Sequence, residues 1–241
     1  MLKVRNLTKH YNDFSLDKIN FQIGEGLILG ISGANGAGKT TLMKLLSKSI
    51  QANEGEITLN NKHEYRDILT YHPSIFPFET FYKVSHVLYF YDSVYETFDL
   101  NKASQKLKNY EIDIKTSISK LSLGQKQKLI LAIILSIEAQ LILLDEPTDG
   151  VDVFVRNEIL SELQTHVYNT GATLIIATHQ LHFYEDILDY ILYLEDGKQL
   201  FFKDMITFKE SANDYLIEKT EEMNLKNFSY TRQKEHTYDP N

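Results

Sequence analysis

Residues 33–40 have the spacing with the most direct chemical meaning in this sequence. The segment GANGAGKT meets the pattern G-x-x-x-x-G-K-T. Its glycines permit the positive dihedrals and the close backbone approach that a loop needs to turn its N–H groups onto phosphate. Lys39 would then reach the β- and γ-phosphates, and the Thr40 hydroxyl would ligate Mg²⁺. The segment predicts an ATP-binding phosphate loop made of Gly33, Ala34, Asn35, Gly36, Ala37, Gly38, Lys39, Thr40 and Thr41.

The segments on either side favour this prediction over a chance glycine-rich turn. Residues 26–32 (GLILGIS) are a short apolar run, typical of a buried strand. Residues 39–49 follow a helical pattern, with Leu42, Leu45 and Leu46 on one face. A helix that begins near Lys39 would direct its dipole and its free N–H groups at a bound anion.

A second segment with chemical meaning is LILLDEP, at residues 141–147. Four apolar residues predict a buried strand, and Asp145 follows at its end, where a carboxylate can hold Mg²⁺ through water. Glu146 comes next, placed to polarise an attacking water as a general base. Two surface acids after a strand would be the alternative for an isolated Asp-Glu pair. The phosphate loop in the same chain favours the catalytic interpretation.

His179 ends a further apolar run, TLIIAT, at residues 173–178. The carboxyl ends of parallel strands meet at one edge of a sheet, where ligands bind. We therefore expect His179 to lie beside the γ-phosphate and to act in catalysis with Glu146 and Lys39. The others of the eight histidines lack such a position, and an ordinary solvated or core role is favoured for them.

Strands and helices alternate along the chain in an order that can position these residues. The pattern indicates an α/β fold: a P-loop NTPase core with a parallel sheet, an N-terminal antiparallel β subdomain and an inserted helical subdomain at about 74–135. Asp196-Gly197 is typical of a hairpin turn. The expected strands are Leu2–Arg5, Ser15–Ile23, Gly26–Ser32, Glu56–Leu59, Ile68–Tyr71, Leu141–Leu144, Thr173–Ala177, Ile191–Leu194 and Lys198–Phe202, with helices over 39–49 and Val153–Val167.

The composition is that of an ordinary globular chain and excludes several kinds of site. Of 241 residues, 43% are hydrophobic and 24% charged, and the net charge is −8. This acidic balance argues against nucleic acid as a partner. The chain has no cysteine, which rules out disulfides, thiolate metal sites and cysteine nucleophiles. Apolar runs such as 129–134 are too short to span a bilayer, so we expect membrane association only through a partner subunit.

Together these motifs resemble the ATP-binding subunit of ATP-binding-cassette (ABC) transporters, over residues 1 to about 205. Residues 121–125 read LSLGQ, which is similar to the family signature LSGGQ. Ser122 and Gly124 would open a helix and make another anion site. The resemblance implies that this signature, with Gln125, grips the γ-phosphate of ATP held by the opposite subunit.

From the resemblance we expect an ATPase with ATP and Mg²⁺ as cofactors, working as a head-to-tail dimer with two ATP molecules at the interface. It also implies a transmembrane permease as a partner, and a cytoplasmic position on the inner face of the cell membrane. Tyr11 matches the aromatic residue that stacks on adenine in this family, although a plain core tyrosine is the alternative. Thr148–Asp152 (TDGVD) looks like the loop that crosses the dimer interface, and His179 matches the switch histidine.

Two positions depart from the family pattern. Leu123 stands where the common signature has glycine, which is a mild change. Ser74 stands in Tyr71-His72-Pro73-Ser74, where patterns like Y-x-P-Q have the glutamine that touches Mg²⁺ and the attacking water. A serine is too short to do the same without a bridging water. We therefore expect altered metal contact or altered coupling at Ser74.

The region from Phe76 to Phe98 contains nine aromatic residues. In the family, the helical subdomain carries the groove for a coupling helix of the membrane subunit, and aromatic residues are favoured anchors at interfaces. A subdomain core is the alternative for most of them. The best docking candidates are Phe76, Phe78 and Tyr82, nearest Ser74.

A finer resemblance concerns residues 91–103 (YDSVYETFDLNKA), which are similar to Gram-positive exporter ATPases for peptides and drugs, such as the phenol-soluble-modulin subgroup. An exporter ATPase with residues 1–205 as its domain and 206–241 as a C-terminal helical segment and polar tail is therefore expected. A soluble ABC ATPase without a transporter, such as an iron–sulfur assembly scaffold, stays open as the alternative. An unrelated phosphate-loop kinase would not explain LSLGQ or His179.

Overall fold

The computed structural model describes residues 1–211, so residues 212–241 of the expected helical segment and polar tail at 206–241 lie outside the described residues. The chain forms two compact units, residues 1–202 and residues 203–241. The described part of the second unit consists of the end of a strand and a helix over 205–211. At the start of this helix, Asp204 accepts hydrogen bonds from the backbone N and the hydroxyl of Thr207. No helix within residues 1–211 is long and apolar enough to cross a bilayer.

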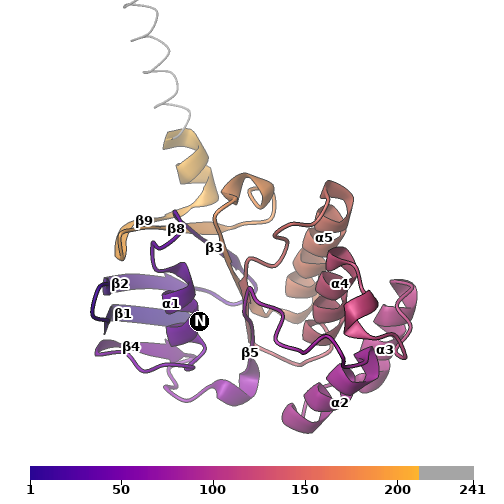
Figure 1. Cartoon of the computed structure of the whole chain (residues 1–241). Coiled ribbons are helices and arrows are strands. Elements are labelled where there is room, and N and C mark those ends of the chain that lie inside the picture. Colours follow the sequence, from indigo (N-terminus) through magenta and orange to yellow (C-terminus); the bar gives the residue numbers. More distant parts are fainter. Residues whose placement is uncertain (212–241) are drawn as a thin grey trace, which may run out of the picture. The chain divides into compact units, whose positions relative to one another are not determined.

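One mixed sheet organises residues 1–202. Within the described chain its nine strands follow the order β4-β1-β2-β9-β8-β3-β7-β6-β5 (Figure 1). Strands β5, β6, β7, β3 and β8 pair in parallel in that order, whereas β1 pairs antiparallel with both β2 and β4. The predicted α/β class is thus confirmed. The strands are β1 (Leu2–His10), β2 (Ser15–Ile23), β3 (Ile28–Ser32), β4 (Glu54–Leu59), β5 (Leu69–His72), β6 (Leu141–Asp145), β7 (Thr173–Thr178), β8 (Tyr190–Glu195) and β9 (Lys198–Asp204).

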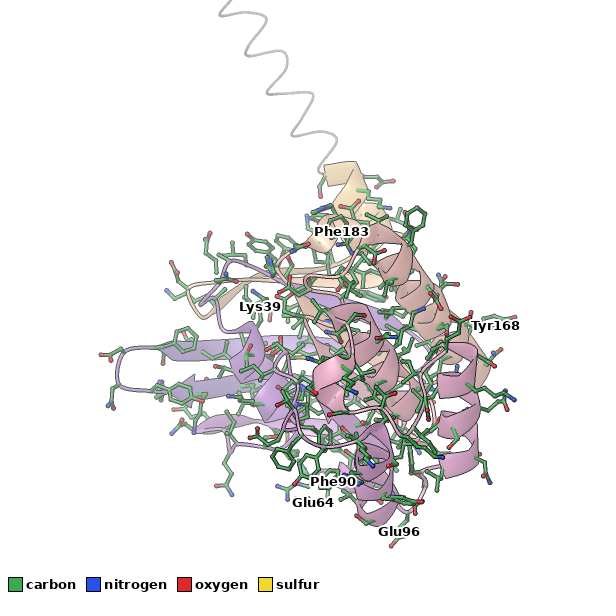
Figure 2. All side chains as sticks on the ribbon, turned by 45° about the vertical axis from the view of Figure 1, so that its right-hand side comes forward. Lys39, Glu64, Phe90, Glu96, Tyr168 and Phe183 are labelled. Carbon is green, nitrogen blue, oxygen red and sulfur yellow. The ribbon has the colours of Figure 1, made fainter. Side chains whose placement is uncertain are left out.

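The helices fall into two groups. Helix α1 packs its leucine face, predicted from the sequence, into the core formed with the strands. Helices α2 to α5 lie together on the other side of the parallel strands in Figure 1. Figure 2 labels one side chain from each group, Lys39 on α1 and Phe90 on α2. The helices are α1 (Lys39–Leu46), α2 (Val84–Val94), α3 (Leu100–Asn109), α4 (Leu123–Ile134) and α5 (Val153–Thr170), with short 3-10 turns at Arg66–Ile68, Ile118–Lys120 and Leu181–Phe183.

Several element boundaries differ by a few residues from the sequence-based expectation, and two of these differences have a local reason. Strand β1 continues to His10 instead of ending at Arg5, because it pairs with β2 and β4 across bulges that break its alternating pattern. Helix α1 ends at Leu46 instead of residue 49, and Lys48 beyond it adopts a left-handed φ of 58°. The predicted hairpin turn has positive φ at both Asp196 and Gly197, as a type I′ turn requires.

A buried histidine at the end of β5 makes stability depend on pH. His72 is 4% exposed, and its Nδ1 has no hydrogen-bond partner within residues 1–211. Burial lowers the pKa of His72 from 6.5 to about 4. As the pH falls, His72 is protonated in the unfolded chain before it is protonated in the folded chain. The contribution of His72 to the free energy of unfolding is therefore fully present above pH 6.5 and is lost as the pH drops toward 4. At 1.36 kcal/mol per pH unit, the loss attributable to this group is on the order of 3 kcal/mol.

Urea unfolding at pH 7 and at pH 5 measures this effect. We expect His72→Leu to show a clearly smaller loss between the two pH values than the original chain. His63→Leu removes an exposed histidine and should keep the original pH dependence. Equal pH dependence in His72→Leu and the original chain would contradict the assignment.

Candidate nucleotide site

The predicted phosphate loop connects a fully buried strand to a helix. Every residue of β3 is buried, and the loop leaves its end for α1. Three of its glycines have positive φ: 151° at Gly33, 84° at Gly36 and 104° at Gly38. Gly38 is the N-cap of α1, so the free N–H groups of the first helical turn face the loop. This arrangement is the anion-binding geometry that the spacing predicts.

Two glycines of the loop differ in how tightly they are enclosed. A Cβ on Gly33 would lie 2.2 Å from the carbonyl oxygen of Leu194, whereas a Cβ on Gly36 would meet nothing within 4 Å. We expect Gly33→Ala to lower the free energy of unfolding by at least about 2 kcal/mol, because the backbone must move. Gly36→Ala should cost about 1 kcal/mol through its positive φ alone. Urea unfolding of both variants tests this, and equal losses would contradict it.

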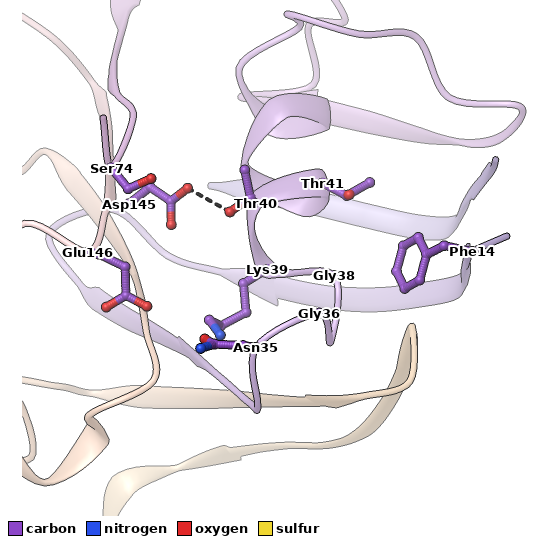
Figure 3. Close-up of a pocket in the computed structure, with 10 residues that line it drawn as sticks. All are labelled: Phe14, Asn35, Gly36, Gly38, Lys39, Thr40, Thr41, Ser74, Asp145 and Glu146. Carbon is purple, nitrogen blue, oxygen red and sulfur yellow. Dashed lines mark hydrogen bonds between the residues drawn. The ribbon is translucent and has the colours of Figure 1, made fainter. Parts of the chain in front are cut away.

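Lys39 is held inside the loop. Its side chain is 7% exposed, and Nζ donates to the carbonyl oxygens of Gly33, at 2.8 Å, and Ala34, at 3.1 Å. Burial lowers the pKa of Lys39, while the nearby carboxylates of Glu146 and Asp145 act in the opposite direction. The ammonium group thus lies between the loop carbonyls and two acids, and Figure 3 shows it next to Asn35 in the pocket.

Thr40 and Asp145 meet at the metal position expected from the sequence. The Thr40 hydroxyl donates to Asp145 Oδ2 at 2.8 Å (Figure 3). Asp145 is 2% exposed; burial raises its pKa, and the hydrogen bond from Thr40 opposes that shift. A hydroxyl and a carboxylate oxygen are donors of the hard type that Mg²⁺ prefers, so the residues present fit this ion.

Glu146 and His179 form a pair at the edge of the sheet. Glu146 Oε1 accepts hydrogen bonds from His179 Nδ1 at 2.8 Å and from the His179 backbone N at 3.0 Å. Glu146 itself has a left-handed φ of 52°, and its backbone N donates to the carbonyl oxygen of Ala177. The sequence predicted both residues separately, but their direct contact is a product of the tertiary structure.

Sheet order explains why distant residues meet here. Strand β7 lies between β3 and β6, and β5 flanks β6, so the residues after all four parallel strands share one edge. The loop after β5 brings Ser74 into the same pocket as Asp145. This pocket of about 330 Å³ is lined by Phe14, Asn35, Gly36, Gly38, Lys39, Thr40, Thr41, Ser74, Asp145 and Glu146.

The aromatic residue at this pocket is Phe14, which the sequence reasoning missed. A Cβ on Gly38 would lie 2.9 Å from Phe14 Cζ, and Figure 3 shows the ring across the loop from Asp145 and Glu146. Tyr11, the expected adenine residue, does not line this pocket: it is 48% exposed and its ring centre lies 6.4 Å from that of Phe14. Phe14 directly follows a bend at residues 12–13, which is closed by a hydrogen bond from Tyr11 N to the Phe14 carbonyl oxygen.

The signature residues occupy a separate place in the chain. Ser122 is the N-cap of α4 and forms a capping box with Gln125: Gln125 N donates to Ser122 Oγ at 3.2 Å, and Ser122 N donates to Gln125 Oε1 at 3.0 Å. With Gly124 these residues line a different hollow of about 420 Å³. Asp152 lines the same hollow and caps α5 by accepting from Phe154 N and Val155 N. None of these four residues lines the phosphate pocket.

An aromatic groove lies on the helical side of β5. Its volume is about 580 Å³, and nearby side chains are unusually exposed, with Phe81 at 70%, Tyr89 at 62% and Phe90 at 50%. Phe76 and Phe78 form an edge-on ring pair, and Phe78 also contacts Phe90. The groove is lined by Tyr71, Pro73, Pro77, Phe78, Glu79, Tyr82, His86, Phe90 and Tyr91.

Comparison with known proteins gives one consistent family. The model of the family described as "ABC transporter" matches residues 16–149. The chain is 31% identical over 216 residues to the ABC transporter ATP-binding protein YtrB of Bacillus subtilis, covering 87% of this chain and 74% of that protein. It is 32% identical to the lantibiotic transport ATP-binding protein SrtF of Streptococcus pyogenes, covering 82% and 88%, and 30% identical to the bacitracin transport ATP-binding protein BcrA of Enterococcus faecalis, covering 82% and 67%.

Solved structures share the fold. An ATP-binding subunit of an ABC transporter superposes with a TM-score of 0.78 at 20% identity, covering 88% of this chain and 93% of the other. A dimeric ATP-binding cassette in a post-hydrolysis state, bound to ADP and Pi, superposes with a TM-score of 0.75 at 23% identity, covering 85% and 99%. At these identities the likeness shows the architecture alone.

Proposed function

The chain belongs to the ABC transporter family as an ATP-binding subunit with an ATPase fold, and from that premise we propose that it hydrolyses ATP to drive export through a separate permease. The observation that carries the proposal is the meeting of Lys39, the Thr40–Asp145 pair and the Glu146–His179 pair around one pocket.

The residues in and beside this pocket have distinct chemical roles in the proposal. The loop N–H groups and Lys39 hold the β- and γ-phosphates. Thr40 and Asp145 hold Mg²⁺, which when bound would neutralise the charge on the phosphate oxygens. Glu146 orients and deprotonates the attacking water, and His179 positions Glu146. Phe14 and Tyr11, at the outer side of the loop, are the candidates for contact with the adenine ring.

A second subunit completes the site in this proposal. Ser122, Gly124 and Gln125 start a helix, which gives them the free N–H groups of an anion site, yet they lie outside the phosphate pocket of their own chain. A head-to-tail dimer would place this signature, and the loop that ends at Asp152, against the nucleotide of the opposite subunit. Each ATP would then lie between two chains.

The permease is proposed to dock in the aromatic groove. The groove combines an apolar lining with exposed rings at its rim, as interface anchors require. The groove and the phosphate pocket adjoin the same segment of chain, because Tyr71 and Pro73 line the groove and Ser74 lines the phosphate pocket. In this proposal, occupancy of the groove acts on the hydrolytic site through the adjacent residues Pro73 and Ser74. The chain would be attached to the membrane through this contact between the groove and the permease.

The direction of transport is proposed from the relatives. SrtF and BcrA are named as transport proteins for a lantibiotic and for bacitracin, which favours export of a peptide-like compound, and the run at 91–103 agrees with this. The soluble alternative, an assembly scaffold without a permease, would leave the exposed rings of the groove without a function.

Co-expression with a candidate permease tests the proposal. We expect the two proteins to copurify in detergent, and we expect Phe90→Glu to abolish copurification while keeping the ATPase rate of the isolated chain. Tyr168→Glu, at an 88% exposed ring on α5, is the matched control and should keep the complex (Figure 2). A complex that survives Phe90→Glu would rule out this groove, and an original chain that copurifies with no permease would favour the soluble alternative.

Ser74 offers a direct test of the metal side of the site. Ser74→Gln adds an amide long enough to reach a metal ion held by Thr40 and Asp145. We expect the Mg²⁺ concentration for half-maximal ATPase rate to fall about fivefold, the factor that one added hydrogen bond or ligand contact supports. Ser161→Gln, on the exposed face of α5, should change nothing. An unchanged Mg²⁺ dependence and an unchanged rate in Ser74→Gln would remove Ser74 from this role.

A further inference from the structure

Gln180 follows His179 and makes two side-chain contacts at the edge of the sheet. Its Nε2 lies 3.0 Å from His179 Nε2 and 3.4 Å from Asp149 Oδ1. Its backbone N donates to Thr178 Oγ1 at 3.0 Å, which fixes the residue relative to β7. Asp149 belongs to the loop after Glu146 and donates its backbone N to the Glu146 carbonyl oxygen at 3.2 Å. The four residues Asp149, Gln180, His179 and Glu146 therefore form a closed ring of contacts.

The donors and acceptors in this ring allow one arrangement. Asp149 and Glu146 are carboxylates and can only accept. The NH₂ side of the Gln180 amide must therefore face Asp149, and the same nitrogen donates to His179 Nε2. A neutral imidazole has one donor and one acceptor, so its proton lies on Nδ1, where it is donated to Glu146 Oε1. In the opposite tautomer, His179 Nε2–H would face the NH₂ group of Gln180, and the unprotonated Nδ1 would face the Glu146 carboxylate.

The loop that carries Asp149 is itself packed against the segment after Gln180. The hydroxyls of Thr148 and Tyr184 are 2.6 Å apart in a buried contact. The guanidinium of Arg156 lies 3.4 Å from the centre of the Phe183 ring, and one of its nitrogens donates to the carbonyl oxygen of Val151. Asp149 and Gln180 are thus brought together by packing contacts on both sides. The same loop continues to Gly150 and Asp152 beside the start of α4.

We propose that Gln180 is a positioning residue that holds His179 in the Nδ1–H tautomer and thereby keeps Glu146 engaged in a resting state. The role in the ATP cycle rests on the proposed function above. In this state Glu146 Oε1 accepts two hydrogen bonds from His179, and His179 Nε2 has no proton to offer a phosphate oxygen. A movement of the loop at 149–152 against a second subunit would withdraw Asp149, release the Gln180 amide and free both catalytic side chains.

The tautomer can be measured without nucleotide. Long-range ¹H–¹⁵N correlation spectra of protein labelled at the imidazole nitrogens distinguish Nδ1–H from Nε2–H, and the His179 signal is assigned by its loss in His179→Gln. We expect the Nδ1–H pattern in the original chain. Gln180→Leu should lose it, and Gln180→Glu, which turns the donor into an acceptor, should give a proton on both ring nitrogens, because each would then face a carboxylate. Gln105→Leu, at an exposed position on α3, is the control and should keep it.

The ATPase assay provides the second measurement. Gln180→Leu removes the side-chain contacts with His179 and Asp149 from the resting state. The ATP concentration at half-maximal rate should therefore fall by at least about fivefold, the factor that one neutral hydrogen bond corresponds to. An Nε2–H pattern in the original chain, or an unchanged tautomer in Gln180→Leu, would overturn the proposal. A chain with no ATPase activity but with the expected tautomers would instead remove the proposed function and keep Gln180 as the residue that orients His179.

Discussion

Glu146→Gln should lower the ATP hydrolysis rate by roughly 10² to 10⁴-fold, the contribution typical of a general base, while ATP binding is retained. The amide keeps the size of the carboxylate but cannot take a proton from water. The phosphate loop, Lys39 and the Thr40–Asp145 pair are untouched by the change. The variant should therefore accumulate as an ATP-bound dimer, because hydrolysis is the step that reopens the interface in the proposed cycle.

Size-exclusion chromatography with ATP and Mg²⁺ and a phosphate-release assay together measure both outcomes. Glu138→Gln removes a carboxylate at an exposed position and should hydrolyse ATP at the original rate and remain monomeric after turnover. A Glu146→Gln variant that turns over normally would show that another group activates the water. A variant that is inactive yet never dimerises would count against the shared-interface site.

Lys39→Met should weaken ATP binding by at least about tenfold, since a charge-assisted hydrogen bond to phosphate contributes about 1.5–3 kcal/mol. Lys39 is the buried cation of the pocket and lies between the loop carbonyls and the carboxylates of Asp145 and Glu146. Its removal would leave those carboxylates uncompensated beside an anionic ligand, so the effect on binding should exceed that of any surface lysine.

Isothermal titration with ATP measures this change directly. Lys44→Met is the matched control, because Lys44 lies on the exposed face of the same helix α1, and its dissociation constant should stay within about twofold of the original. Circular dichroism should confirm that both variants are folded, since Lys39 also bridges two loop carbonyls. Equal binding by Lys39→Met and the original chain would contradict the phosphate role of Lys39.

The local motifs were predictable because their chemistry lies in consecutive residues. The loop at 33–40 needs a strand before it, a helix after it and glycines in between, and all three conditions are visible in the sequence. Asp145 and His179 were placed at strand ends from apolar runs alone, and the structure has them there. The α/β class followed from the same alternation.

Relations between distant segments were harder to predict because they depend on which strands pair. The insertion of β7 between β3 and β6 brings His179 onto Glu146, and no local pattern specifies that order. Phe14 instead of Tyr11 lines the phosphate pocket because the turn at residues 12–13 directs the later ring toward Gly38. The hydrogen bond from Gln180 to His179 likewise depends on the loop at Asp149, which arrives from a different strand.

The sequence by itself therefore determined the phosphate loop, the acidic pair at 145–146, the family signature and the α/β class, because glycine spacing, strand ends and helix caps are short-range properties. Only the tertiary structure decided that Ser122, Gly124, Gln125 and Asp152 stand apart from the pocket formed by their own chain. Sheet order sets that separation through long-range backbone pairing. The phosphate loop at residues 33–40 and the signature that begins at Ser122 are thus separate sites of the chain, more than eighty residues apart in the sequence.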